Sequence, residues 1–94
     1  MITVMLDKKR HIRFPLNALE KFEDVTGLKI FDMPAPTEMT IKQFKAFLWA
    51  GLIHEDETLT IEQVGDMIDS GNLDKVTAAV NKVWAEVGET KRPL

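Results

Sequence analysis

Histidines and carboxylates are the side chains of this 94-residue sequence that are best suited to chemistry. His11 and His54 lie far apart in the sequence, and neither has another histidine three or four residues away, the spacing of a helical metal site. Ser70 is the single serine and cysteine is absent, so no nucleophile stands beside a base. Two sets of neighbouring carboxylates suit a helix surface in water: Glu20, Glu23 and Asp24, and Asp66 and Asp69. We therefore expect a protein that is not an enzyme, with no catalytic, cofactor-binding or metal-binding residues.

An acidic stretch from His54 to Gly65 has the length of a calcium-binding EF-hand loop but not its ligands. Such a loop needs oxygen ligands at positions 1, 3, 5 and 12 and a glycine at position 6. Here His54 stands at position 1, Leu59 at position 6 and Gly65 at position 12. The stretch is predicted to be a solvated turn between two helices.

Composition and charge exclude several classes of function. The net charge is −3, divided between residues 1–36, with six Lys/Arg and five Asp/Glu (+1), and residues 37–94, with six and ten (−4). An acidic C-terminal half opposes binding to nucleic acid, and the one basic cluster, Lys8–Arg10 with Arg13, is predicted to be a solvated hairpin turn. No apolar run approaches the roughly 20 residues that span a bilayer, and the N-terminus lacks the pattern of a signal peptide. These features predict an intracellular protein without a membrane or nucleic-acid partner.

Hydrophobic patterning and helix signals predict an α+β fold that is mostly α, with an N-terminal β-hairpin packed on about four short helices. Ile2–Leu6 and His11–Phe14 are the expected strands. The first helix begins at Pro15 and ends at Gly27. Three further helices are expected over Ile41–His54, over Ile61–Ser70 and from Leu73 onward. A single globular domain is predicted over residues 1–88, with a flexible tail over residues 89–94.

Local capping signals support these helices. Thr40 with Gln43, and Thr60 with Gln63, have the spacing of a capping box. Asn72 is placed to cap the last helix, whose stripe of Leu73, Val76, Val80, Val83, Trp84 and Val87 predicts a buried face.

The segment around Trp49 carries more apolar surface than one helix face can hold. On a helical wheel, Ile41, Phe44, Leu48 and Leu52 cluster as the expected core face. Phe47, Trp49 and Ile53 fall outside that cluster, so they are candidates for a face that binds a partner or a second copy of the chain. The alternative is that the hairpin and the other helices cover both sides of this helix.

Four motifs together resemble one family: Leu16–Gly27, Leu48–Asp56, Leu59–Val64 and Gly71–Leu73. They are similar to the small tail assembly chaperones of long-tailed, siphovirus-type bacteriophages and prophages. The resemblance extends from about Phe14 to Val87. It adds no catalytic motif, in agreement with the residues themselves.

The resemblance implies a non-enzymatic role in virion assembly, in the cytoplasm of a bacterial host. Members of the family bind the tape measure protein and keep it soluble while tail tube subunits polymerise around it, and they are absent from the finished particle. Many also have a longer form made by programmed frameshifting, for which the segment Lys91–Leu94 would be the place to look. Phe47, Trp49 and Ile53 are the residues we expect to contact the client. The alternative function is a small structural adaptor that stays in the virion, such as a head–tail or tail-completion protein. A transcriptional regulator is disfavoured because no basic recognition helix is present.

Overall fold

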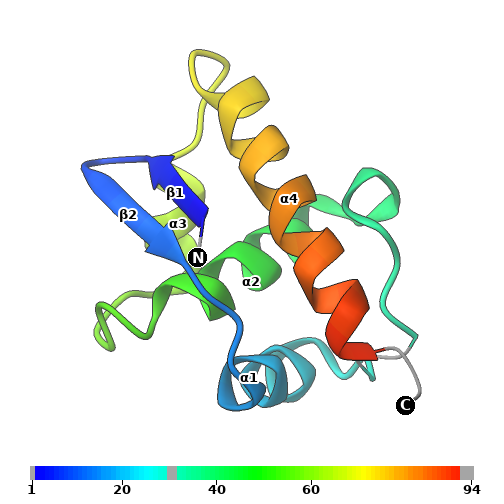
Figure 1. Cartoon of the computed structure of the whole chain (residues 1–94). Helices are drawn as coiled ribbons and strands as arrows, with labels where there is room; N and C mark the ends of the chain where they lie inside the picture. The colour runs from blue at the N-terminus through cyan, green and yellow to red at the C-terminus, as the bar shows by residue number, and fades with distance from the viewer. Residues whose placement is uncertain (1, 30–31, 92–94) are drawn as a thin grey trace.

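The computed structural model describes residues 2–29 and 32–91, with side chains to Val87. A two-stranded hairpin is followed by helices that enclose one core (Figure 1). The elements are β1 (Ile2–Met5), β2 (Lys9–Ile12), α1 (Leu16–Thr26), the short 3₁₀ helix η2 (Pro36–Glu38), α2 (Ile41–Leu52), α3 (Ile61–Asp66) and α4 (Leu73–Lys91). This architecture confirms the predicted α+β, mostly α class.

The hairpin is antiparallel, and Ile2 pairs with Ile12 while Val4 pairs with Arg10. Val4 and Ile12 are buried, because strand β1 lies against α4 and strand β2 against α2. A two-stranded ribbon gains its stability from such docking rather than from its own pairing. The hairpin therefore covers one side of the helical core.

Helix ends follow the local signals closely. Gly27 ends α1 in the left-handed conformation with φ of 74°, a region that suits glycine. Both capping boxes form: the hydroxyl of Thr40 accepts from the Gln43 amide of α2, and the hydroxyl of Thr60 accepts from the Gln63 amide of α3. The predicted starts of α2 and α3 are thus confirmed.

Helix α3 is shorter than predicted, ending at Asp66 instead of Ser70. Side chains of the following turn bind the local backbone: Asp69 accepts from the Gly71 amide, and Asn72 accepts from the Asp69 amide and donates to the Met67 carbonyl. Such local bonds compete with helical hydrogen bonding. The Asn72 side chain, expected to cap α4, closes this turn.

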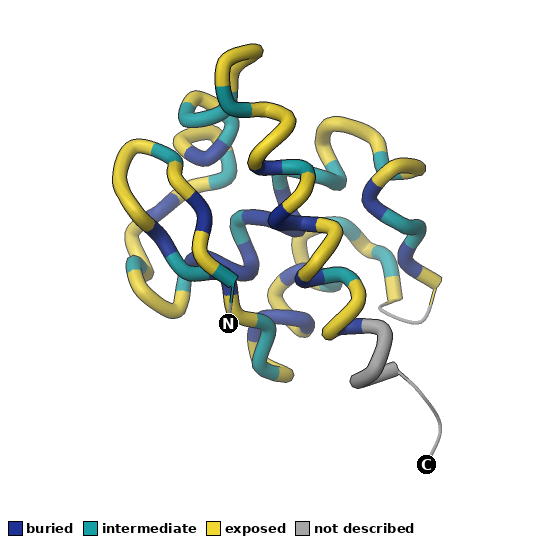
Figure 2. Tube along the Cα trace, turned by 45° about the horizontal axis from the view of Figure 1, so that its top comes forward, coloured by how far each residue is buried: buried dark blue, intermediate teal, exposed yellow. Residues whose placement is uncertain are grey.

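Buried residues gather on the inner faces of the helices, with α2 at the centre (Figure 2). From α4, Val76, Val80, Val83 and Val87 are buried, as the stripe predicted, while Trp84 is half-buried and Leu73 is exposed. The largest fully buried side chains elsewhere are Phe22, Phe47, Ile12, Leu48, Leu52 and Val64. A core of this kind explains how a small chain holds a hairpin and several short helices together.

Arg10 corrects the prediction that the basic cluster is a solvated turn. Its side chain is only 5% exposed; the guanidinium donates to both carboxylate oxygens of Asp7, at 2.8 and 2.9 Å, and lies 3.9 Å from Asp56. The hydrogen bond from Arg10 lowers the pKa of the Asp7 carboxyl. Burial of the charge is tolerated because it is paired in a bidentate manner.

The C-terminal end of the chain also differs from its prediction. Helix α4 continues to Lys91, so residues 89–91 are helical and are not the loose tail that was expected. Pro93 disfavours helix only from the residue before it. Residues 92–94, the rest of the predicted tail, lie outside the described part of the chain.

Candidate functional site

The predicted partner-binding residue Phe47 is part of the core, and that prediction is wrong. Its side chain is 0% exposed. Its ring stacks on Phe14 with centroids 4.4 Å apart, and meets Phe22 and Trp84 edge-on at 5.7 and 6.0 Å. The end of the hairpin, α1 and α4 therefore cover this side of α2, which was the alternative left open by the sequence.

Trp49 and Ile53, the other two candidates, are half-buried and packed against the core. The indole N–H of Trp49 donates to the Leu59 carbonyl at 2.8 Å, which holds the turn after α2 against the helix. Together with Pro15 and Lys21, Trp49 and Ile53 line a shallow depression of about 520 Å³ between α1 and the end of α2. We call it the Trp49 depression. Partner binding at these two residues stays a prediction.

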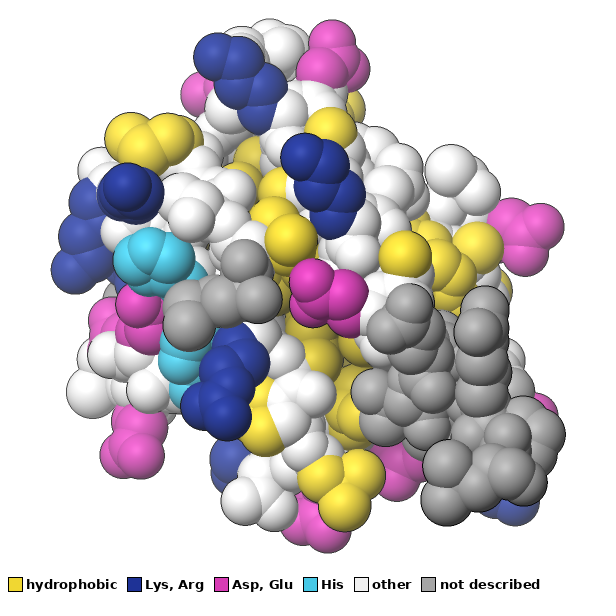
Figure 3. Space-filling view, in the orientation of Figure 1, with side chains coloured by type: hydrophobic (Ala, Val, Ile, Leu, Met, Phe, Trp, Pro, Cys, Tyr) yellow, Lys and Arg dark blue, Asp and Glu magenta, His cyan; other side chains and the backbone are white. Residues whose placement is uncertain are grey.

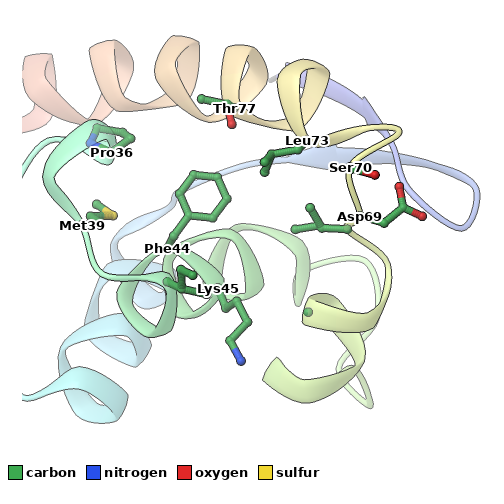
Figure 4. A pocket seen from close by; sticks show the side chains of 11 residues that line it. Pro36, Met39, Phe44, Lys45, Asp69, Ser70, Leu73 and Thr77 are labelled. Atoms are coloured by element: carbon green, nitrogen blue, oxygen red, sulfur yellow. The ribbon is translucent and has the colours of Figure 1, made fainter.

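A second, more apolar hollow lies on the other side of α2. This α2–α4 groove has a volume of about 510 Å³ and is lined by Pro36, Met39, Ile41, Phe44, Lys45, Gly65, Ile68, Asp69, Ser70, Leu73 and Thr77. In Figure 4, Phe44 stands in its middle, with Leu73 and Thr77 of α4 on one side and Asp69 and Ser70 at one end. Residues of η2, α2, α4 and the loops between them thus line one groove.

Helix starts explain why this groove is open. Ile41 and Leu73 are the first residues of α2 and α4, and their side chains are 79% and 47% exposed. Helical side chains lean toward the helix N-terminus, so a first-turn side chain reaches beyond the body of its helix. The wheel placed Ile41 on the core face, and the structure corrects that prediction; Phe44 from the same face is half-buried.

Lys45 borders the groove and lies along α3. A Cβ built on Gly65 would be 2.8 Å from the Lys45 Cδ, so the lysine stem passes directly over this glycine. A glycine inside a helix costs about 1 kcal/mol relative to alanine. At Gly65 the absence of a Cβ allows the Lys45 stem to lie this close, and the two residues form the side of the groove next to α3.

Charged and apolar side chains are separated on the surface. Figure 3 shows hydrophobic side chains along the middle of one face, where α4 crosses the domain, with lysines, arginines and carboxylates around them. Among the residues that the structure describes, the exposed large hydrophobic ones outside the groove are Met5, Leu16 and Val25. Single exposed residues of this kind are normal, whereas several around one hollow indicate a binding surface.

The two histidines, far apart in sequence, meet in the structure. The His11 backbone N–H donates to Glu55 Oε1 at 2.8 Å, and His11 Nδ1 lies 2.9 Å from Glu55 Oε2. His54 Nε2 lies 2.8 Å from the His11 carbonyl oxygen. We call these three residues the histidine clip.

The histidine clip joins β2 to the end of α2, and the Arg13 amide adds a bond to the Gly51 carbonyl at 2.9 Å. The backbone hydrogen bond from His11 lowers the pKa of the Glu55 carboxyl. Among the described residues, no group of three or more metal-binding side chains is found. The clip fastens β2 to the end of α2, and only the folded chain could reveal it because His11 lies more than 40 residues before His54 and Glu55.

Comparisons of the chain with protein-family models, curated proteins and solved structures gave no match. In the part of the chain that the structure describes, no helix has the length and hydrophobicity needed to cross a membrane. Function is therefore inferred from the groove and from the motifs that resemble the tail assembly chaperones.

Proposed function

We propose that this chain is a non-enzymatic tail assembly chaperone that binds the tape measure protein in the cytoplasm of a bacterial host. The α2–α4 groove is the observation that supports this proposal: it is lined by apolar side chains, and two of its large ones, Ile41 and Leu73, are substantially exposed. An amphipathic helix binds such a groove through residues at positions i, i+3, i+4 and i+7. A tape measure protein has to present many such helices before tube subunits enclose it.

The exposed apolar surface of the groove limits how tightly a client can bind. Complete burial of one large aliphatic side chain contributes about 1.5–3 kcal/mol. Ile41 is 79% and Leu73 47% exposed, and Phe44 is already half-buried, so each would add only part of that amount, about 3–5 kcal/mol in all. Lost translational and rotational freedom costs about 4–15 kcal/mol, so further contacts of the client have to add to this apolar contribution. Binding of moderate strength suits a chaperone, because the client has to be released to the growing tube.

Co-expression with the tape measure protein tests this proposal. Ile41→Asp should reduce the soluble, co-purifying client strongly, because a carboxylate in the groove opposes an apolar helix face. The variant should still fold, since an acidic residue in the first turn of α2 suits the helix dipole. Leu16→Asp is a matched control: Leu16 is also the first residue of its helix and is 77% exposed, against 79% for Ile41. Equal loss of client with both variants would contradict the proposal.

Mass spectrometry of purified particles separates the chaperone from the alternative, a structural adaptor. A chaperone is released before the particle is complete, so its peptides should be missing from virions. Stoichiometric amounts of the chain in washed particles would instead support a head–tail or tail-completion role.

A further inference from the structure

The segment that forms one end of the α2–α4 groove is strongly acidic. Between Lys45 and Lys75 the sequence contains no lysine or arginine. The same segment carries seven carboxylates: Glu55, Asp56, Glu57, Glu62, Asp66, Asp69 and Asp74. Their effect depends on which of them are paired within the fold.

Two of these carboxylates have a basic side chain as a partner within the fold, and three others do not. Asp56 lies near Arg10, and Glu55 pairs with His11. Within the described residues, no lysine or arginine pairs with Asp66, Asp69 or Asp74. These three exposed carboxylates form what we call the acidic rim.

The members of the acidic rim are lining residues of the groove or their direct neighbours in the sequence. Asp69 lines the groove, and Asp66 and Asp74 each directly follow a lining residue, Gly65 and Leu73. The one basic side chain of the lining, Lys45, has its stem laid over Gly65, with its ammonium pointing away from Phe44 in Figure 4. At the other end of the groove, Glu38 precedes the lining residue Met39 and adds another carboxylate. Lys42 directly follows the lining residue Ile41, so two lysines stand against four carboxylates in or next to the lining. The charge around this apolar hollow is therefore acidic on balance, and within the described residues Asp66, Asp69 and Asp74 have no cationic partner.

We propose that the groove selects amphipathic helices whose apolar stripe is flanked by lysine or arginine. This inference rests on the proposed helix-binding function and defines the chemistry of its client segments. Basic side chains beside the apolar stripe would reach the acidic rim, whereas acidic ones would be repelled by it. Charge complementarity of this kind discriminates between partners and raises the rate of association.

Two synthetic peptides test the selection directly. They share one leucine stripe of helical period and differ only in their flanking residues, lysine in one and glutamate in the other. Fluorescence anisotropy with the intact chain at low salt should show binding of the lysine peptide about tenfold tighter than that of the glutamate peptide. The preference should shrink at 0.5 M NaCl, because the Debye length falls to a few ångströms.

Charge reversal identifies the rim as the cause. Asp66→Lys with Asp74→Lys should invert the preference in favour of the glutamate peptide. Asp69 is left intact because its carboxylate accepts from the Gly71 amide and shapes the turn. Glu20→Lys with Asp24→Lys, at exposed positions of α1, changes the net charge equally and should preserve the preference.

Three results would overturn this inference: equal affinity for the two peptides, no binding of either peptide, or an equal effect of the rim and α1 variants. They are distinct from failure of the proposed function. Capture of the tape measure protein in co-expression, together with no peptide preference, would refute the charge selection alone. Peptide preference without capture of that client would refute the proposed client and leave the selection intact.

Discussion

The two sides of helix α2 have similar composition but opposite environments. On one side, Phe47 is enclosed by Phe14, Phe22 and Trp84. On the other, Ile41 and Phe44 border a groove that is open to solvent. Hydrophobicity alone does not separate core from binding surface; the difference is set by which neighbouring elements reach each side.

The two ends of α2 differ in the same way. Its C-terminal end is fastened to β2 by the histidine clip and by the Arg13–Gly51 hydrogen bond. Its N-terminal end is held by a capping box made of its own residues, with Ile41 exposed beside it. We expect substitutions at the fastened end to change stability and substitutions at the open end to change binding.

Truncation of Phe47 should give the largest loss of stability. Phe47→Ala removes a fully buried ring that contacts three other aromatic rings, and we expect a cost of about 3–5 kcal/mol in the free energy of unfolding. Ile41→Ala should change it by less than about 0.5 kcal/mol, because the side chain is mostly solvated. Urea denaturation followed by circular dichroism measures both. Similar costs for the two variants would erase the distinction between the sides of α2.

Adding a methyl group at Gly51 should give the next largest effect. A Cβ there would lie 2.6 Å from Ile12 Cγ2 and 2.7 Å from Phe14 Cε2, between the hairpin and the helix. We expect Gly51→Ala to cost about 1–3 kcal/mol through overpacking. Gly65→Ala is the control, since its Cβ meets only the flexible stem of Lys45, which can move aside. Thermal unfolding compares them, and a greater cost at Gly65 would contradict the assigned packing.

Loss of a helix cap should reduce stability by a smaller amount, which should be similar at the two capping boxes. Thr40→Ala and Thr60→Ala each remove a hydroxyl that accepts from a backbone amide, at an expected cost of about 1 kcal/mol. Thr→Ser at either position should restore most of it. Denaturant midpoints test this, and costs near zero would mean that water satisfies these amides equally well.

Acid should weaken the fastened end of α2 and its neighbouring turn. Hydrogen bonds from His11 lower the pKa of Glu55, and hydrogen bonds from Thr58 lower that of Asp56. A carboxyl whose folded pKa is depressed stabilises the fold above its unfolded pKa, and that stability is lost as the pH falls through the folded value. The melting temperature should therefore stay constant from pH 7 to 5. It should decrease once the pH is below the ordinary pKa of a carboxyl group.

Glu55→Gln tests the clip itself. This variant should show a smaller drop in melting temperature between pH 5 and 3 than the wild type, because one of the titrating groups is gone. Glu57→Gln, an exposed carboxylate two residues away, is the control and should leave the drop nearly unchanged. An equal change in both variants would show that the clip has no special part in acid unfolding.

Local features of the fold were predictable from sequence, whereas the site was not. The capping boxes and the glycine at the end of α1 depend on residues within a few positions of one another, so the sequence predicts them correctly. The burial of Phe47 depends on Phe14, 33 positions earlier, and on α4. A helical wheel holds no information about these distant neighbours.

The groove was missed for a related reason. Ile41 belongs to the apolar stripe of α2, but as the first helical residue it projects past the elements that cover the rest of the stripe. The sequence holds one signal for the groove. Apolar residues directly follow positions 40 and 72, where two helices start, and a side chain at such a position extends past the body of its helix. The functional assignment itself stays a prediction, supported by the motifs and by this groove.

The position at which the client binds on the chain distinguishes the α2–α4 groove from every other surface of the domain. Labelled with ¹⁵N, the chain can be titrated with fragments of the tape measure protein while amide chemical shifts are followed. We expect the largest shift changes around the α2–α4 groove, at Phe44, Gly65 and Leu73, with little change at Leu16. Changes centred on Trp49 and Ile53 would contradict this expectation and would place the client in the Trp49 depression instead.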